Sequence, residues 1–168
     1  MKRLPWNVRL KGAGDDFGFA LPTLVAGGQK LQAGSRPLLV RLVGGTAPYK
    51  VDIKDAGGAL VASQSSDNHE VELRAVALAP GVYHITASDS TPRSLEADVA
   101  VVTDGPPQSG AFTDLSDPEV KIAASSTILA RDHPADWSFE AEQQLNTAPD
   151  SGLDRDKVYE LIESYGSD

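Results

Sequence analysis

The sequence predicts a mainly β fold, a two-sheet antiparallel β-sandwich followed by a small α-helical C-terminal segment. Two turn-and-strand stretches, at residues 44–53 and 78–87, predict the sandwich. The helical segment follows from a change in the spacing of apolar residues. They recur at every second position before about residue 103, and at every third or fourth position after about residue 113.

The first stretch reads GGTAPYKVDI and combines a specified turn with a clean strand pattern. Its two glycines allow backbone angles that other residues avoid, and Pro48 restricts its own φ. Tyr49, Val51 and Ile53 then alternate with polar residues. This period of two predicts a half-buried antiparallel strand.

The second stretch reads LAPGVYHITA and repeats this arrangement. Pro80 and Gly81 form the corner, and Tyr83 and Ile85 begin the buried face of the strand that follows. A tyrosine directly after such a corner predicts a structural hydrogen bond from its hydroxyl to the backbone of the loop. We therefore expect Tyr49, Pro80, Gly81 and Tyr83 to be structural corner residues.

Together, GGTAPYKVDI and LAPGVYHITASD resemble bacterial Ig-like repeats of the PKD and SprB kind. The resemblance covers roughly residues 36–102. It implies an Ig-like β-sandwich. It also implies the use that such modules usually have, as spacers or binding domains of surface and envelope proteins.

Other short alternating or apolar segments, separated by Gly, Pro, Asp and Ser turns, complete the strand prediction. A small barrel is the structural alternative. The expected division of the chain is N-terminal strands and a loop that belong to the sandwich (1–35), the sandwich core (36–103), a linker (104–113) and an acidic segment of two to three helices (114–168). The remaining expected strands are 4–11, 17–25, 36–43, 59–64, 69–74 and 95–101.

Three helices are expected in the last third of the chain. The first begins with Asp117 as its cap and Pro118 at its first position, and the second follows Pro134. Asp154 caps the third, which ends at Gly166. Such short amphipathic helices pack on each other, dock on the sandwich or meet another protein.

The large apolar residues of these helices are the candidate partner-binding residues. They recur at helical spacing, and the alternative use for each is intramolecular core. They are Trp137, Leu145, Val158, Leu161, Ile162 and Tyr165.

Charge is distributed unevenly along the chain. The net charge of −9 arises entirely in residues 114–168, which hold thirteen acidic and four basic residues. This disfavours nucleic acid and anionic membranes as partners. No run of residues is long and apolar enough to span a bilayer. The first eleven residues are basic but lack the apolar core of a signal peptide, so we expect a protein that is cytoplasmic or separated from its leader.

Residues that could carry chemistry are sparse, so we expect no catalysis, cofactor or metal. There is no cysteine, and therefore no disulfide or thiolate site. His69, His84 and His133 lack the spacing of metal ligands, and no nucleophile or phosphate-binding motif occurs. Acidic residues in the loops could hold Ca²⁺ at one end of the sandwich, although turn formation is the alternative use of Asp15, Asp16, Asp55, Asp67 and Asp89.

The expected function is non-catalytic. We expect a protein–protein interaction or accessory module of a bacterial, envelope-associated assembly, located in the periplasm or cell envelope, with the cytoplasm as the alternative. The protein partner is unidentified. A carbohydrate-binding or adhesion module of a surface protein is the alternative function, and it requires a row of exposed aromatic residues.

Overall fold

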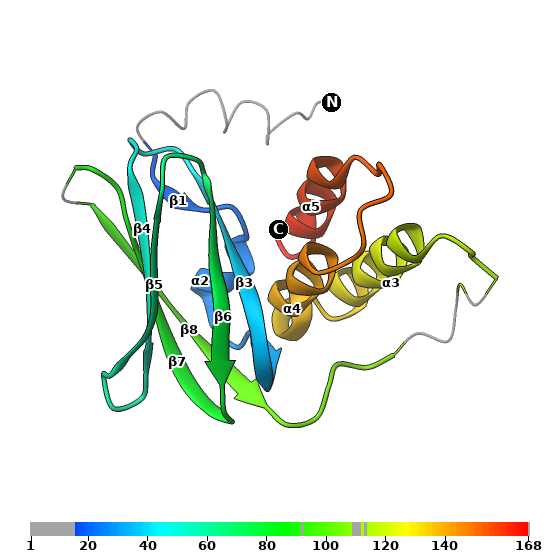
Figure 1. The fold of residues 1–168 in the computed structure, drawn as a ribbon, viewed down its shortest axis with the longest axis horizontal. Coiled ribbons are helices and arrows are strands. Elements are labelled where there is room, and N and C mark those ends of the chain that lie inside the picture. Colours follow the sequence, from blue (N-terminus) through cyan, green and yellow to red (C-terminus); the bar gives the residue numbers. More distant parts are fainter. Residues whose placement is uncertain (1–15, 92, 109–111, 113, 168) are drawn as a thin grey trace.

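The computed structural model describes residues 16–91, 93–108, 112 and 114–167, and its strands form two sheets packed face to face (Figure 1). The strands are β1 (Gly18–Phe19), β2 (Lys30–Gln32), β3 (Gly34–Val43), β4 (Tyr49–Asp55), β5 (Leu60–Ser66), β6 (Glu70–Leu78), β7 (Gly81–Ser88) and β8 (Ser94–Val102). The sheet orders are β1-β3-β6 and β2-β8-β7-β4-β5. All pairs are antiparallel except β2 with β8. The predicted sandwich is confirmed.

The strand order is that of an Ig-like module. In such folds one sheet contains strands B and E, and the other contains G, F and C, to which variable-type domains add C′. The pair β3-β6 corresponds to B and E, and the run β8-β7-β4-β5 corresponds to G, F, C and C′. The core lies between the sheets and includes Val51 and Ile53 of β4 and Ile85 of β7, which are at most 1% exposed.

The expected strand over residues 17–25 is wrong beyond its first residues. Only Gly18 and Phe19 pair with β3, and the chain then forms the short helix α2 (Pro22–Ala26). Pro22 suits the first position of a helix, where its missing N–H costs nothing. A short apolar run does not distinguish a strand from a buried helix. The predicted strand 4–11 lies outside the described residues.

Two tyrosine hydroxyls bind the loops that precede their strands. The Tyr83 hydroxyl donates to the carbonyl of Ala79 (3.0 Å) and accepts from its N–H (3.1 Å). The Tyr49 hydroxyl donates to the carbonyl of Gly44 (3.1 Å). Its oxygen also lies 3.0 Å from Nε2 of His69. These bonds fasten the two turns to their strands.

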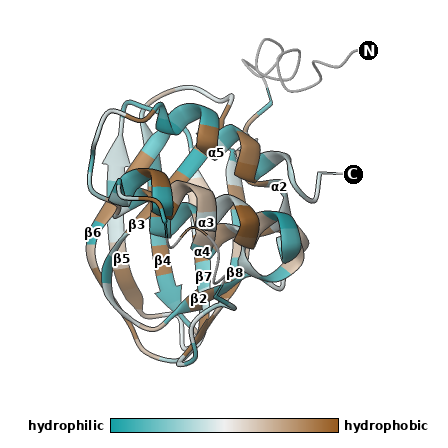
Figure 2. Ribbon diagram, turned by 90° about the vertical axis from the view of Figure 1, so that its right-hand side faces the viewer, coloured by the Kyte–Doolittle hydropathy of each residue, from teal (hydrophilic) through white to brown (hydrophobic). Residues whose placement is uncertain are grey.

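Three helices follow the sandwich, and the starts of the first two match the sequence pattern, whereas Asp154 precedes the third without a capping hydrogen bond from its side chain. They are α3 (Pro118–Asp132), α4 (Pro134–Asn146) and α5 (Arg155–Ser164). The carboxylate of Asp117 accepts from the backbone N–H groups of Glu119 (2.9 Å) and Val120 (3.3 Å) and so caps α3. In Figure 2 the helices lie in front of the strands as a separate layer.

The side chain of Gln143 on α4 binds the edge of β3 as a strand would. Its amide oxygen accepts from the N–H of Leu39 (2.7 Å), and its amide nitrogen donates to the carbonyl of Leu39 (2.9 Å). Both residues are at most 4% exposed. Because a buried, unpaired backbone group is costly, this one side chain makes it possible to bury the edge.

Further contacts fix α4 across the gap between β2 and β3. Phe139 of α4 is 1% exposed and belongs to the core of the sandwich. The Gln29 side chain donates to the carbonyls of Pro134 and Ala135 (both 2.9 Å) and accepts from the N–H of Phe139 (2.9 Å). The Glu140 carboxylate accepts from the backbone N–H of Gln32 (3.0 Å). The helix α4 therefore shares the core of the sandwich.

Replacing Gln143 by leucine is expected to destabilise the protein strongly. The variant Gln143→Leu leaves the N–H and carbonyl of Leu39 buried without partners, at a cost of about 1–3 kcal/mol for each group. We expect a loss of roughly 2–4 kcal/mol in the free energy of unfolding, measured by urea denaturation with an unchanged m-value. The control Gln144→Leu alters the half-buried neighbour and should cost under about 1 kcal/mol. Equal losses in both variants would refute the role of Gln143.

Candidate functional site

Half of the predicted partner-binding residues lie in the interior of the protein. Leu145 and Ile162 have no exposed surface, and Trp137 is 7% exposed. All three belong to a second hydrophobic cluster that joins the helices to Leu39 of β3. The apolar residues Trp137 and Leu145 of α4 pack inside the protein because this helix lies between β3 and the other two helices. In this conformation these three residues cannot contact a partner.

The other predicted residues are all on α5 or directly after it, and they are more accessible. Leu161 is 45% exposed, whereas Val158 and Tyr165 are half-buried and pack against the second cluster. The accessible apolar surface of the helical layer therefore lies on the side of α5 that faces away from the sheets.

A groove of about 420 Å³ runs between α3 and α5 on this outer side of the helical layer. We call it the helical groove. Residues from α3, from α5 and its preceding loop, and from the segment before α3 line it. They are Phe112, Val120, Ala123, Ala124, Thr127, Ile128, Arg131, Leu153 and Val158.

The sequence of α3 explains why the groove exists. Val120, Ala124, Thr127 and Ile128 recur at helical spacing and share one face. The opposite face of α3 packs inward through Leu129 and other residues of the second cluster. The helix thus has apolar residues on two sides, and the small side chain at position 124 leaves the outer side hollow.

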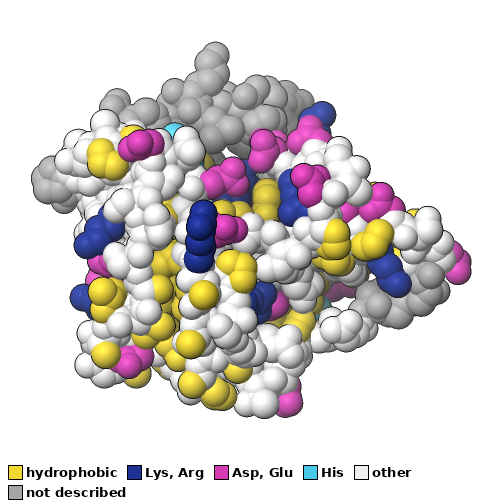
Figure 3. Space-filling model, viewed as in Figure 1, with side chains coloured by type: hydrophobic (Ala, Val, Ile, Leu, Met, Phe, Trp, Pro, Cys, Tyr) yellow, Lys and Arg dark blue, Asp and Glu magenta, His cyan; other side chains and the backbone are white. Residues whose placement is uncertain are grey.

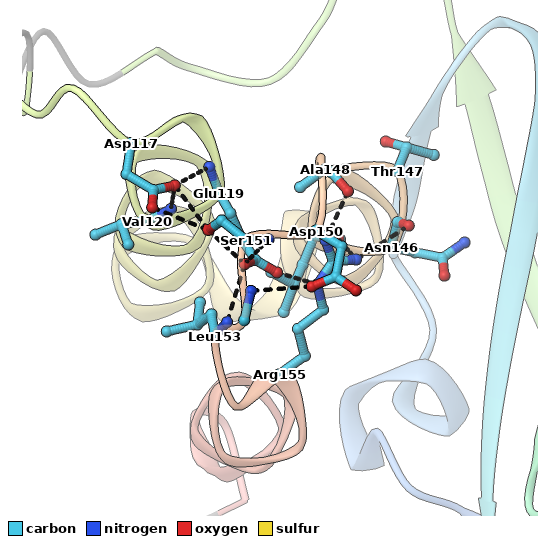
Figure 4. Close-up of polar contacts among 12 residues, drawn as sticks. Asp117, Glu119, Val120, Asn146, Thr147, Ala148, Asp150, Ser151, Leu153 and Arg155 are labelled. Carbon is cyan, nitrogen blue, oxygen red and sulfur yellow. Dashed lines mark hydrogen bonds and ion pairs between the residues drawn. The ribbon is translucent and has the colours of Figure 1, made fainter.

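One buried carboxylate holds the end of the groove together (Figure 4). Glu119 in the first turn of α3 has no exposed surface. One of its oxygens accepts from the N–H of Ser151 (2.6 Å) and the N–H of Leu153 (3.0 Å), both in the loop before α5. The other oxygen accepts from Nε of Arg155 (2.5 Å). Glu119 therefore ties α3 to α5.

The ionisation of Glu119 follows from these donors. Burial by itself raises the pKa of a carboxyl group, but the hydrogen bonds from Arg155, Leu153 and Ser151 outweigh it and lower the pKa of Glu119 to about 2. Arg155 also donates to the backbone carbonyls of Leu145 (3.0 Å) and Ala148 (2.6 Å) at the end of α4. All three helices meet at this ion pair.

A cluster of buried ionisable residues lies where α4 and α5 meet β3. Arg41 of β3 donates to the carboxylate of Glu163 (2.6 Å) and lies 4.6 Å from the ring centroid of Tyr159. The neighbouring Glu142 is 1% exposed and lies close to Glu163, and among the described residues its Oε1 atom has no hydrogen-bond partner. Burial raises the pKa of Glu142 well above its usual range, and the nearby Glu163 raises it further. Burial next to Glu163 therefore favours the protonated form of Glu142.

These two clusters predict opposite effects of pH on stability. The pKa of Glu142 is higher in the folded state, so its contribution is complete below the unfolded value of about 4.3 and is lost as pH rises, at up to about 1.4 kcal/mol per pH unit. The variant Glu142→Gln should flatten the decline of stability between about pH 5 and 8.

Glu119 provides the matched comparison, since its folded pKa is lowered. Its contribution is present above the unfolded value and is lost as pH falls towards about 2, so Glu119→Gln should flatten only the acid side. Urea unfolding measured from pH 3 to 8 separates the two variants. A decline above pH 5 that persists unchanged in Glu142→Gln would contradict the assignment.

The exposed surroundings of the groove are acidic. Figure 3 shows Asp and Glu side chains gathered over α5, with hydrophobic side chains visible between α5 and α3. Asp154 and Asp156 at the start of α5 and Asp114 before α3 are exposed. Arg131 is the basic residue in the lining of the groove, and its guanidinium donates to Asp132 (2.8 Å).

Two of the histidines, His69 and His84, and two of the loop acids, Asp55 and Asp89, have structural contacts, and Asp15 lies outside the described residues. His69 binds the Gly44 carbonyl (2.9 Å) and His84 binds Asp98 across two strands. Asp89 is buried and accepts from the N–H of Thr46 (3.0 Å) and from Arg93 (2.8 Å). Among the described residues, no group of three or more His, Asp or Glu side chains could hold a metal ion.

The Asp55 carboxylate shapes its own hairpin by accepting from the N–H groups of Gly57 and Ala59 (both 2.9 Å). Within the residues that the structure describes, every helix is too short or too polar to cross a membrane.

Comparison with known proteins gives similarity to solved β-domains alone. No protein-family model and no curated protein sequence matches the chain. CopC from Methylosinus trichosporium OB3b is 25% identical over 45% of this chain and 83% of CopC, with a TM-score of 0.35. Fibronectin(III)-like modules of Clostridium thermocellum CbhA are 21% identical over 53% of this chain and 98% of theirs, with a TM-score of 0.34.

A third similar structure is the complex of Porphyromonas gingivalis RgpB pro- and mature domains. It is 12% identical over 51% of this chain, with a TM-score of 0.38. The chain spans only 19% of that protein. With TM-scores of this size, the fold class rests on the strand order and packing described above.

Proposed function

We propose that this chain is a non-catalytic binding module that holds a protein partner in the helical groove between α3 and α5. The proposal rests on an apolar groove that stays open to solvent. The other apolar faces of the helices are buried in the second hydrophobic cluster and against the sandwich. Apolar surface left exposed in this way is typical of interaction sites.

The chemistry of the groove indicates what the partner presents. Val120 on α3 and Leu161 on α5 are 37% and 45% exposed and lie on the two helices that form the groove. The residues around them are mostly acidic, and the segment 114–168 carries all of the net charge. The best match is a short amphipathic segment with apolar side chains for the groove and basic residues beside them.

The contacts of the buried ionisable groups support a non-catalytic role. Glu119 is saturated by protein donors, and Glu163 accepts from Arg41 beside the buried Glu142. Glu119 and Glu163 thus have structural partners, and none of these three acids lines the helical groove. A catalytic acid or base needs instead to reach a substrate in a cleft.

Carbohydrate binding or adhesion remains the second candidate function. A sugar-binding face requires exposed aromatic rings. Among the described residues, the large hydrophobic side chains that are exposed are all aliphatic, namely Val25, Leu60, Val82, Leu115, Val120 and Leu161. This composition favours the protein partner.

The proposed setting is a bacterial assembly of the periplasm or cell envelope. It rests on the resemblance of residues 36–102 to PKD- and SprB-type repeats, and it fits a chain without cysteines. In such a setting the module would be an accessory part that contacts its neighbour through the helical groove.

A photo-crosslinking amino acid placed in the full-length chain tests the proposal. Position 127 lies in the wall of the groove, and position 96 is an exposed control site on the outer face of β8. In lysate of the source cells, we expect a discrete protein adduct from position 127 and none from position 96. Adding Ile128→Lys, which repels a basic segment, should reduce the adduct at least about tenfold, equivalent to ~1.4 kcal/mol.

The control for this substitution is Val25→Lys, which alters an exposed aliphatic residue on α2 and should leave the adduct unchanged. Circular dichroism and thermal unfolding confirm that both variants fold. Equal adducts from positions 127 and 96, or an adduct that Ile128→Lys does not weaken, would refute the groove as the binding site.

A further inference from the structure

The strand β5 is an edge of the five-stranded sheet, and β6 of the other sheet lies beside it without pairing. This sheet has two edges, β2 and β5. The β2 edge is occupied by α4, since the Glu140 carboxylate accepts from the N–H of Gln32. Within the described residues, β5 pairs with β4 alone. One side of β5 therefore presents unpaired backbone N–H and carbonyl groups along the strand.

This edge lacks two of the features that usually prevent pairing with another strand, charged residues and proline, and its bulge lies only at its start. Natural edge strands are guarded by charges, prolines, bulges or a short length. The sequence of β5 is LVASQSS, which holds no charged residue and no proline over seven residues. Its register with β4 is regular from Ala62 to Ser66, and the one irregularity lies at its start. Leu60, at that start, is 58% exposed.

We propose that β5 is a self-association edge, on which two copies of this chain pair antiparallel about a twofold axis near Ser63. In this arrangement Ser63 lies opposite Ser63 of the second copy, and Ala62 lies opposite Gln64 of the second copy, within the regular part of the strand. The two five-stranded sheets become one continuous sheet. The contact is isologous, as in most homodimers, and it places only small or uncharged side chains opposite each other.

The charge distribution selects a second copy as the occupant. The acidic segment 114–168 forms the helices, which cover the β2 and β3 side of the sandwich. The β5 edge is the opposite edge of the same sheet (Figure 2). Pairing through β5 therefore keeps the acidic helices of the two copies at the far ends of the dimer, where their repulsion is weak. Any contact between helical faces would bring like charges together.

A single introduced cysteine tests the geometry directly, because the natural chain has none. Residues directly opposite in an antiparallel pair have Cα atoms about 4.5–5.5 Å apart, a distance that a disulfide spans. Under mild oxidation, full-length Ser63→Cys should form a covalent dimer at least about tenfold faster than Ser94→Cys. Ser94 is an exposed serine on β8, where it pairs with Ser88 of β7, away from the β5 edge.

Sedimentation velocity of the cysteine-free protein provides the second measurement. Pairing of a single strand buries less area than a stable dimer needs, so we expect a concentration-dependent monomer–dimer equilibrium between about 10 µM and 1 mM. Ser63→Lys places like charges opposite each other across the twofold axis and should weaken the dimer at least about tenfold, whereas Ser94→Lys should not.

Three results would overturn the proposal. One is a strict monomer at the highest concentration, and another is equal crosslinking of the two cysteine variants. The third is slow hydrogen exchange of the β5 amides in a sample that is monomeric, which would mean that another segment of the same chain occupies the edge.

Discussion

The structure depends on how α4 is seated against β3. A sandwich with an open edge must satisfy the backbone groups of that edge, and here Gln143 does so for Leu39 in place of a strand. The position of Phe139 in the core follows from this seat, because it lies one helical turn before Gln143. The sandwich and the helices are thus parts of one packed unit.

The packing of α4 against β3 also shows that some acidic residues of the C-terminal segment have a structural role. By composition its charge suggests a solvated surface, yet Glu119, Glu140, Glu142 and Glu163 are all buried. Glu119 and Glu163 are paired with arginines, Glu140 accepts from Gln32 and from Arg36 (2.9 Å), and burial raises the pKa of Glu142. Part of the acidic excess therefore holds the helices in place. The exposed remainder surrounds the helical groove.

Local patterns in the sequence predict the elements but not their assembly. The strands after the two Gly- and Pro-containing turns and the helix starts at Pro118 and Pro134 depend on neighbouring residues, and the structure confirms them. The role of Gln143 depends on a contact with a residue more than a hundred positions away, which no local pattern contains. The same limit explains why Leu145 and Ile162 look like binding residues in the sequence and are core residues in the fold.

The two proposed surfaces follow from one asymmetry of the fold. A sandwich has two open sides, and in this chain the helices cover only one of them. On the covered side, α4 uses its residues to bind the sheets, so α3 and α5 form the outer surface and the groove between them. On the other side, β5 keeps a free backbone edge. Because the net charge lies entirely in the helical segment, a basic partner and a second copy of the chain would approach opposite sides and would not compete.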